Sequence, residues 1–139
     1  MEKKWVLMTN DDGIEAPGFE HLVKAMNRAG IPLVAFAPST NKSACSMQLN
    51  LGKPIDLHNR NELIEQWNLD ASVGVHLFAL DGTPCDTMIV ALDGGLKHVL
   101  PDIQPSIVLS GVNLGPNLSQ DSYHSGTMGA AREAGLYGM

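Results

Sequence analysis

Two adjacent carboxylates, Asp11 and Asp12, directly follow the apolar stretch Trp5 to Met8 and precede Gly13. Neighbouring acids repel each other, and a divalent cation bound to both removes that repulsion. Ligands of open α/β sheets bind just beyond the carboxyl ends of strands, which is where this pair is expected to lie. The alternative interpretation is an Asx-type turn, in which such a side chain hydrogen-bonds its own backbone. The pair alone does not decide between the two.

Three further polar loops are expected at the same sheet edge. Loop 37–44 contains several hydroxyls and one lysine, although a polar surface loop is the simpler interpretation. Loop 81–86 is typical of a tight turn that leads into a helix. Loop 110–127 is rich in glycine and asparagine and ends in Ser125-Gly126-Thr127, a helix start with two hydroxyls that suits a phosphate group.

Carboxylates, hydroxyls and carboxamides dominate these loops. Such a hard-oxygen set favours Mg²⁺, Mn²⁺ or Ca²⁺ over zinc. His124 directly precedes the last helix and is a candidate for protonating a leaving group. Cys45 and Cys85 are expected to be free thiols in a cytoplasmic protein. The other four histidines are expected to be surface or core residues: His21, His58, His76 and His98.

Apolar segments and helical patterns alternate along the chain, which predicts an α/β fold with a doubly wound, mostly parallel sheet. Strands are expected at 4–8, 33–37, 73–80 and 107–109, with an irregular or edge strand in 47–57. Helices are expected at 18–29, at 61–67, from Thr83-Pro84 onwards, and at 125–137. The last residues resemble a helix end that leads into another element. We therefore expect 1–139 to be the N-terminal Rossmann-like portion of a longer domain.

The composition is that of an ordinary globular domain, with 44% apolar and 17% charged residues in a chain of 139. A net charge of −6 argues against a nucleic-acid polymer as the partner, but a small phosphate ligand beside a cation is compatible with it. The apolar runs are too short to span a bilayer, and Met1 to Met8 does not resemble a signal peptide. Neither a membrane nor a nucleic acid is expected as a partner.

Five blocks of motifs follow one another along the chain: Thr9–Ile14 with Ala16-Pro17-Gly18, Ala37-Pro38 with Ser43, Gly82-Thr83-Pro84 with Asp86, Ser110–Asn113 with Gly115 and Asn117, and Ser125–Thr127 with Gly129-Ala130-Ala131. In this order they resemble the SurE family, the stationary-phase survival proteins, which are metal-dependent nucleoside monophosphate phosphatases. The run after Ser43, Ala44-Cys45-Ser46, departs from the usual family pattern.

The resemblance implies a Rossmann-like core and a full-length protein that is a dimer or tetramer. It implies one divalent cation, Mg²⁺ or Mn²⁺ with Ca²⁺ as a third candidate, held by Asp11, Asp12, Ser43 and Asn113. It implies a phosphate site formed by Asn117, Ser125, Gly126 and Thr127. The residues expected to act in catalysis are Asp11, Asp12, Asn10, Asn117 and Ser125. The implied reaction is hydrolysis of nucleoside 5′-monophosphates, with 3′-monophosphates as further candidates.

Three alternatives stay open. In the favoured mechanism a metal-bound water attacks phosphorus, whereas in the alternative one aspartate forms an aspartyl-phosphate. A different class of function is a Mg²⁺-binding, receiver-like signalling domain, with Asp56 near the position of a phospho-acceptor. Against it, Asp56 follows the broken segment 52–54, and the Lys-Pro pair that receivers need is missing after Lys97. The third hypothesis is a non-catalytic nucleotide-binding module, which only an assay distinguishes.

Overall fold

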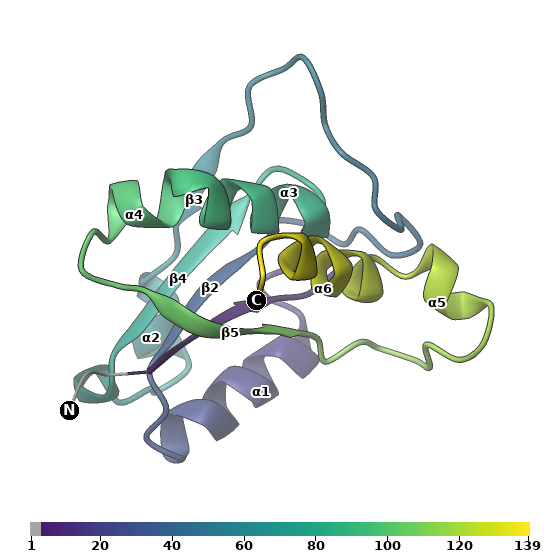
Figure 1. The fold of residues 1–139 in the computed structure, drawn as a ribbon. Coiled ribbons are helices and arrows are strands. Elements are labelled where there is room, and N and C mark those ends of the chain that lie inside the picture. The colour runs from purple at the N-terminus through teal and green to yellow at the C-terminus, as the bar shows by residue number, and fades with distance from the viewer. Residues whose placement is uncertain (1–3) are drawn as a thin grey trace.

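A computed structural model describes residues 4–139, which form one sheet between two layers of helices (Figure 1). The strands are β1 (Trp5–Thr9), β2 (Leu33–Pro38), β3 (Leu57–Asn59), β4 (Val75–Leu80) and β5 (Pro105–Ser110). Their order across the sheet is β3-β4-β2-β1-β5. The pairs β1–β2, β1–β5 and β2–β4 are parallel, and β3 runs antiparallel to β4. The predicted mostly parallel α/β sheet is confirmed.

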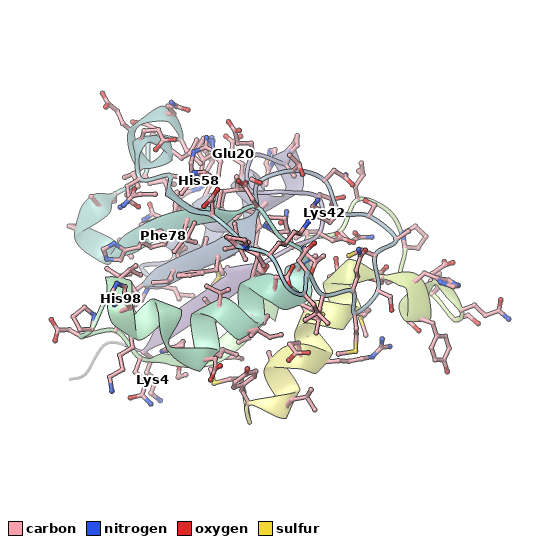
Figure 2. The ribbon with its side chains drawn as sticks, turned by 90° about the horizontal axis from the view of Figure 1, so that it is seen from above. Lys4, Glu20, Lys42, His58, Phe78 and His98 are labelled. Carbon is pink, nitrogen blue, oxygen red and sulfur yellow. The ribbon has the colours of Figure 1, made fainter. Side chains whose placement is uncertain are left out.

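Helices cover both faces of the sheet. One face is covered by α1 (Pro17–Arg28) and α2 (Glu62–Gln66), and the other by α3 (Pro84–Val90), α4 (Leu96–Val99) and α6 (Gly126–Leu136). Figure 2, seen from above, shows α3 and α6 packed against each other over this second face. The shorter elements are the 3-10 turn η1 (Ala71–Val73), the π-helical segment η2 (Ala91–Gly95) and α5 (Asp121–His124).

The longer elements lie close to their predicted positions, and the differences concern short ones. Segment 47–57 is largely irregular, and only β3 at its end pairs with the sheet. The sequence did not predict α4 or α5, because four-residue helices are too short to show a helical period. Thr83 caps α3 as expected, since its hydroxyl accepts from the backbone N–H of Asp86 and the Asp86 carboxylate accepts from that of Thr83.

Alternating side chains of the central strands build two apolar cores. Leu33 and Ala35 of β2 pack towards α1 and α2, whereas Val34 and Phe36 pack towards α3 and α6. Every residue of β2 is buried. Burial on both faces explains why this strand is a continuous apolar run instead of an alternating one. Among the helices of residues 4–139, none combines the length and the apolarity needed to cross a membrane.

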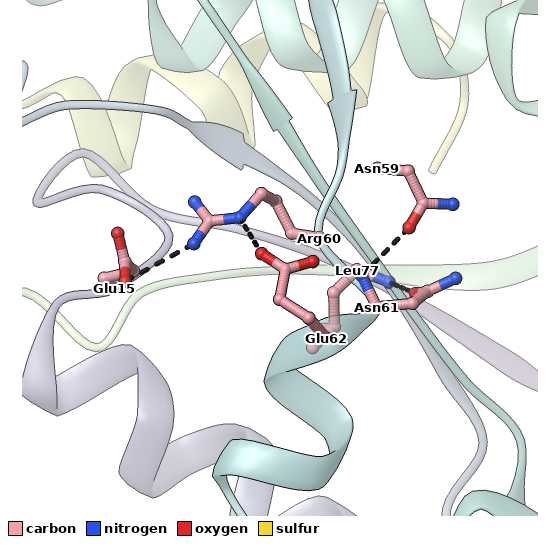
Figure 3. A network of polar contacts seen from close by, with 6 residues as sticks. All are labelled: Glu15, Asn59, Arg60, Asn61, Glu62 and Leu77. Carbon is pink, nitrogen blue, oxygen red and sulfur yellow. Dashed lines mark hydrogen bonds and ion pairs between the residues drawn. The ribbon is translucent and has the colours of Figure 1, made fainter.

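Arg60, just after β3, ties this edge of the sheet to the loop that follows β1. Its guanidinium pairs with Glu62 through Nε and lies 3.4 Å from the Glu15 carboxylate through Nη2 (Figure 3). The pairing with Arg60 holds the pKa of Glu62 below its ordinary value. Glu15 comes three residues after Asp12, so the ion pair lies at the far end of the loop that contains the aspartate pair.

Candidate active site

The turn after β1 is buried and is organised by the side chain of Asn10. Asn10 Nδ2 donates to the backbone oxygen of Gly13 at 2.7 Å, and the backbone N–H of Gly13 donates to Asn10 Oδ1 at 3.2 Å. Gly13 has a φ of +103°, a conformation that side chains disfavour. The Asx-type turn is therefore present and is formed by Asn10, whereas the cation site at the two aspartates stays a prediction.

The aspartates point to different neighbours. Asp11 is 3% exposed, and its Oδ1 accepts a hydrogen bond from Thr127 Oγ1 at 2.9 Å. Asp12 is half-buried, and its Oδ2 accepts from the backbone N–H of Leu114 at 2.9 Å. The hydroxyl of Ser43 lies 3.5 Å from Asp12 Oδ1. Asp12 thereby connects the loop after β2 to the loop after β5.

The loop after β2 brings Ser43 to the site. The backbone N–H of Lys42 donates to the backbone oxygen of Asp11 at 2.7 Å, which docks this loop on the β1 turn. Ala44 and Ser46 both have positive φ values, 60° and 50°, in the run that departs from the family pattern. The Ser46 hydroxyl donates to the backbone oxygen of Tyr123 at 2.6 Å. The loop is therefore fixed at one end by β1 and at the other by α5.

The loop after β5 brings Asn113 to the site, and α6 begins beside it. Asn113 Nδ2 donates to the backbone oxygen of Gly115 at 3.1 Å, and its Oδ1 lies 3.4 Å from Thr127 Oγ1. Ser125 is the N-cap of α6, and its hydroxyl accepts from the backbone N–H of Met128 at 3.1 Å. Because the Ser125 oxygen is the acceptor there, its own proton stays available for an anion.

These groups meet at a pocket of about 210 Å³, at the carboxyl ends of β1, β2 and β5. Its lining comprises Asp11, Ser43, Ala44, Asn113, Leu114, Asn117, Asp121, His124 and Ser125. Three of the four predicted cation ligands, Asp11, Ser43 and Asn113, are in this lining, and Asp12 stands beside it. Of the predicted phosphate residues, Asn117 and Ser125 line the pocket.

The donor set fits a hard divalent cation. Asp11, Asp12, Ser43 and Asn113 supply carboxylate, hydroxyl and carboxamide oxygens, which suit Mg²⁺, Mn²⁺ and Ca²⁺. Within residues 4–139, His, Cys, Asp and Glu side chains form no group of three or more that could hold a metal ion. The candidate site therefore depends on this mixed set of oxygen donors.

Gly126 and Thr127 are not among the residues that line the pocket, and both lie against Asp11. A Cβ atom on Gly126 would lie 2.8 Å from both Asp11 Cβ and Cys45 Sγ, so only glycine fits between them. The Thr127 hydroxyl, predicted to face a phosphate, instead donates to Asp11. Asn10 uses both polar groups of its amide on Gly13, and its predicted catalytic role stays a prediction.

Sequence reasoning missed two polar features of the pocket. Asp121 lines it from α5, a helix that the sequence did not reveal. The backbone N–H of Leu114 holds Asp12, and a backbone donor has no sequence signal. Cys45 and Cys85 are free thiols, as predicted. Burial and the nearby Asp11 charge raise the pKa of Cys45, and burial above all raises the pKa of Cys85 to about 12.

A second polar cluster lies at the ends of β2 and β4. The Asp81 carboxylate accepts from the Ser39 hydroxyl and lies 2.9 Å from His58 Nε2. These hydrogen bonds, His58 first, hold the pKa of Asp81 below its ordinary value. Asp56, the candidate phospho-acceptor of a receiver, is exposed in the irregular segment before β3, away from the end of a buried strand. This placement disfavours the receiver hypothesis.

A larger hollow lies away from this pocket. It has a volume of about 380 Å³ and lies between η2, α4, the start of β5 and the end of α6. Leu92, Leu96 and Ile103 contribute to its apolar wall. In an open α/β fold the ligand site lies at the carboxyl ends of the strands, so the smaller polar pocket is the better candidate for chemistry.

Comparisons with known proteins agree with the motifs. The family model described as "Survival protein SurE" matches residues 6–139. A protein of Anaeromyxobacter sp. (strain Fw109-5) named 5′-nucleotidase SurE is 38% identical over 96% of this chain and 45% of its own length. A protein of the same name from Sorangium cellulosum (strain So ce56) is 41% identical over 96% of this chain and 46% of its own.

A solved structure gives the same result for the fold. The crystal structure of the SurE protein from Aquifex aeolicus superposes with a TM-score of 0.72 at 30% identity, over 97% of this chain and 48% of that one. The chain spans about half the length of the curated relatives that it matches. By its family model, its relatives and its fold, this chain belongs to the SurE family.

Proposed function

We propose that this chain hydrolyses nucleoside 5′-monophosphates to nucleoside and phosphate with the help of one divalent cation, Mg²⁺ or Mn²⁺. The main support is the convergence of oxygen atoms from Asp11, Ser43 and Asn113 on one pocket beside the start of α6. The name 5′-nucleotidase of the relatives supports the substrate class. 3′-Monophosphates and Ca²⁺ are the further candidates.

The cation would be held by Asp11, Asp12, Ser43 and Asn113. When bound, it neutralises the paired carboxylates, polarises the phosphoryl group and lowers the pKa of a water molecule for attack on phosphorus. The backbone N–H of Leu114 keeps Asp12 oriented without neutralising its charge. The hydrogen bond from Thr127 does the same for Asp11.

The phosphate would lie against the N-terminus of α6, an 11-residue helix. The first N–H groups of a helix lack partners within it and attract anions, and here they belong to Gly126 and Thr127. The Ser125 hydroxyl and the Asn117 carboxamide add donors from the pocket wall. Such donors stabilise the charge that develops on the phosphoryl oxygens during transfer. His124 lines the same pocket and is the candidate that protonates the leaving oxygen.

We further propose that the working form is a homo-oligomer. Several large apolar side chains around the pocket are exposed, which is typical of a surface that another protein subunit covers. They are Val112, Leu114, Leu118 and Tyr123.

The test is phosphate release from a panel of 5′- and 3′-mononucleotides with Mg²⁺ or Mn²⁺. Asp11→Asn and Asp12→Asn remove one charge each, and Asp102→Asn, at an exposed site before β5, is the matched control. We expect the control to keep its activity. Replacing a residue that only holds a metal ligand costs roughly 10–100-fold in activity. The two site variants replace predicted ligands themselves, so their activity should fall by more than that.

Activity that persists in both site variants would contradict the cation assignment. Since the relatives are longer, the same panel is also run on a form that continues past Met139. A protein that binds nucleotides tightly but releases no phosphate in either form would be a non-catalytic binding module.

A further inference from the structure

We infer that Thr127 is a positioning residue for the cation site, acting through Asp11. This inference rests on the proposed function, because it assigns Thr127 a task at the same site. The sequence patterns placed the Thr127 hydroxyl on the phosphate. Its contacts instead place it between two of the predicted cation ligands, which come from loops on different strands.

The hydrogen bonds of Thr127 determine this assignment. The residue is 6% exposed, and its Oγ1 lies 2.9 Å from Asp11 Oδ1 and 3.4 Å from Asn113 Oδ1. A threonine hydroxyl has only one proton, and the shorter contact to a charged oxygen receives it. Asn113 Oδ1 cannot donate a proton, so at 3.4 Å it is only a neighbour of this hydroxyl. The hydroxyl therefore has no second proton for a phosphate.

Thr127 is itself held in place from three sides. Its backbone oxygen accepts from the hydroxyl of Ser110, the last residue of β5, at 2.7 Å. The preceding Gly126 packs against Asp11 Cβ, and Ser125 caps the helix. The position of the hydroxyl is thus set by β5 and by the start of α6, and not by Asp11 alone. A donor fixed in this way can orient a carboxylate before the cation arrives.

The buried carboxylate needs this donor. Asp11 is almost inaccessible to water, and a buried charge without hydrogen bonds is costly. A donor to one oxygen restricts rotation of the carboxylate, so that the group meets the cation in one orientation. Groups that hold metal ligands in this manner typically change metal affinity or activity by about 10–100-fold when removed. We expect Thr127→Val to weaken Mn²⁺ binding within that range.

The experiment measures the dissociation constant for Mn²⁺ by electron paramagnetic resonance, together with kcat and KM for a mononucleotide. Thr127→Val keeps the side-chain shape and removes the hydroxyl, whereas Thr127→Ser restores it. The matched control is Thr87→Val, because Thr87 is fully buried and its hydroxyl also contacts two oxygens, the backbone oxygen of Pro84 and Thr9 Oγ1. Thermal unfolding without metal shows whether each variant is folded.

We expect about 10–100-fold weaker Mn²⁺ binding for Thr127→Val, recovery in Thr127→Ser, and no change in Thr87→Val. A Thr127→Val protein with wild-type Mn²⁺ affinity would overturn the inference. A variant in which KM for the nucleotide rises while the Mn²⁺ affinity stays unchanged would also overturn it. Equal losses of Mn²⁺ affinity in Thr127→Val and Thr87→Val would also overturn it, because removal of any buried hydroxyl would then have the same effect. If the wild type binds no Mn²⁺ at all, the proposed function itself fails.

Discussion

The turn that supplies Asp11 and Asp12 and the loop that supplies Asn113 differ in how firmly they are held. The turn 10–13 is buried except for the half-buried Asp12, and it is closed by two hydrogen bonds of the Asn10 side chain. The loop 111–118 is largely exposed, and Leu114 within it is 91% exposed. Its anchors to the β1 end are the Gly111 N–H bond to the Thr9 oxygen and the Leu114 N–H bond to Asp12.

This difference indicates a site with a preformed half and a dependent half. The preformed half consists of the turn 10–13 and the start of α6, which pack against each other through Gly126 and Thr127. The dependent half is the loop 111–118, which takes its position from Thr9 and Asp12. Changes in the first half should reduce both stability and cation binding, and changes in the second should reduce binding alone.

The largest effect is expected from Gly126→Ala. The new Cβ would lie 2.8 Å from Asp11 Cβ and from Cys45 Sγ, and overpacking of this kind costs about 1–3 kcal/mol. Because Asp11 must shift, Mn²⁺ affinity should fall as well. Urea unfolding and Mn²⁺ titration measure the two effects.

Gly135→Ala, on the same helix, is the matched control. A Cβ there meets no atom within 4 Å, and alanine favours the helix by roughly 0.5–1 kcal/mol. Equal unfolding free energies for the two variants would show that the start of α6 is not tightly packed, and the preformed half would then shrink to the turn itself.

The next largest effect is a difference in unfolding free energy between Asn10→Ala and Asn113→Ala. Asn10→Ala leaves the buried N–H and carbonyl of Gly13 without their partner, and we expect a loss of roughly 1–3 kcal/mol in the free energy of unfolding. Asn113→Ala removes one bond at a half-buried position and should stay within about 0.5 kcal/mol of wild type. Both should bind Mn²⁺ more weakly. Similar destabilisation by both changes would contradict the division into two halves.

Much of the preformed half could be predicted from the sequence. The apolar run of β1, the glycine after the two acids and the Ser-Gly-Thr start of α6 have local signals, because strand period, turn chemistry and helix caps depend on neighbouring residues. The capped start of α3 at Thr83 was predictable for the same reason. These elements form the sheet edge where the site lies, so the location of the pocket followed from topology.

The partners within the site could not be predicted in this way. The bond from Thr127 to Asp11 spans 116 positions, and the bond from Leu114 to Asp12 uses a backbone donor that any residue type supplies. The contribution of Asp121 depends on α5, whose four residues give no periodic pattern. Each of these features arises from tertiary packing, whereas the sequence patterns indicate only the secondary structure that neighbouring residues favour.

The smallest effect concerns the loop after β2, in which the Ser43 hydroxyl lies 3.5 Å from Asp12 Oδ1 of the turn 10–13. This loop begins at Ser39, whose hydroxyl donates to Asp81 beside His58. The pKa of Asp81 is lowered in the folded protein, so the contribution of its ionised form is present above the unfolded value of about 3.9 and is lost as the pH falls through the folded value. Since these side chains are exposed, Asp81→Asn should cost less than about 1 kcal/mol at pH 7.

Urea unfolding of wild type and Asp81→Asn at pH 7, 5 and below 4 measures this contribution, and the difference should vanish only at the lowest pH. Mn²⁺ affinity at pH 7 should be equal in the two proteins, because Lys42 docks the loop on Asp11 and Ser46 docks it on Tyr123 without help from Asp81. A marked loss of affinity in Asp81→Asn would mean that Ser43 depends on an exposed cluster. The loop after β2 would then belong to the dependent half of the site.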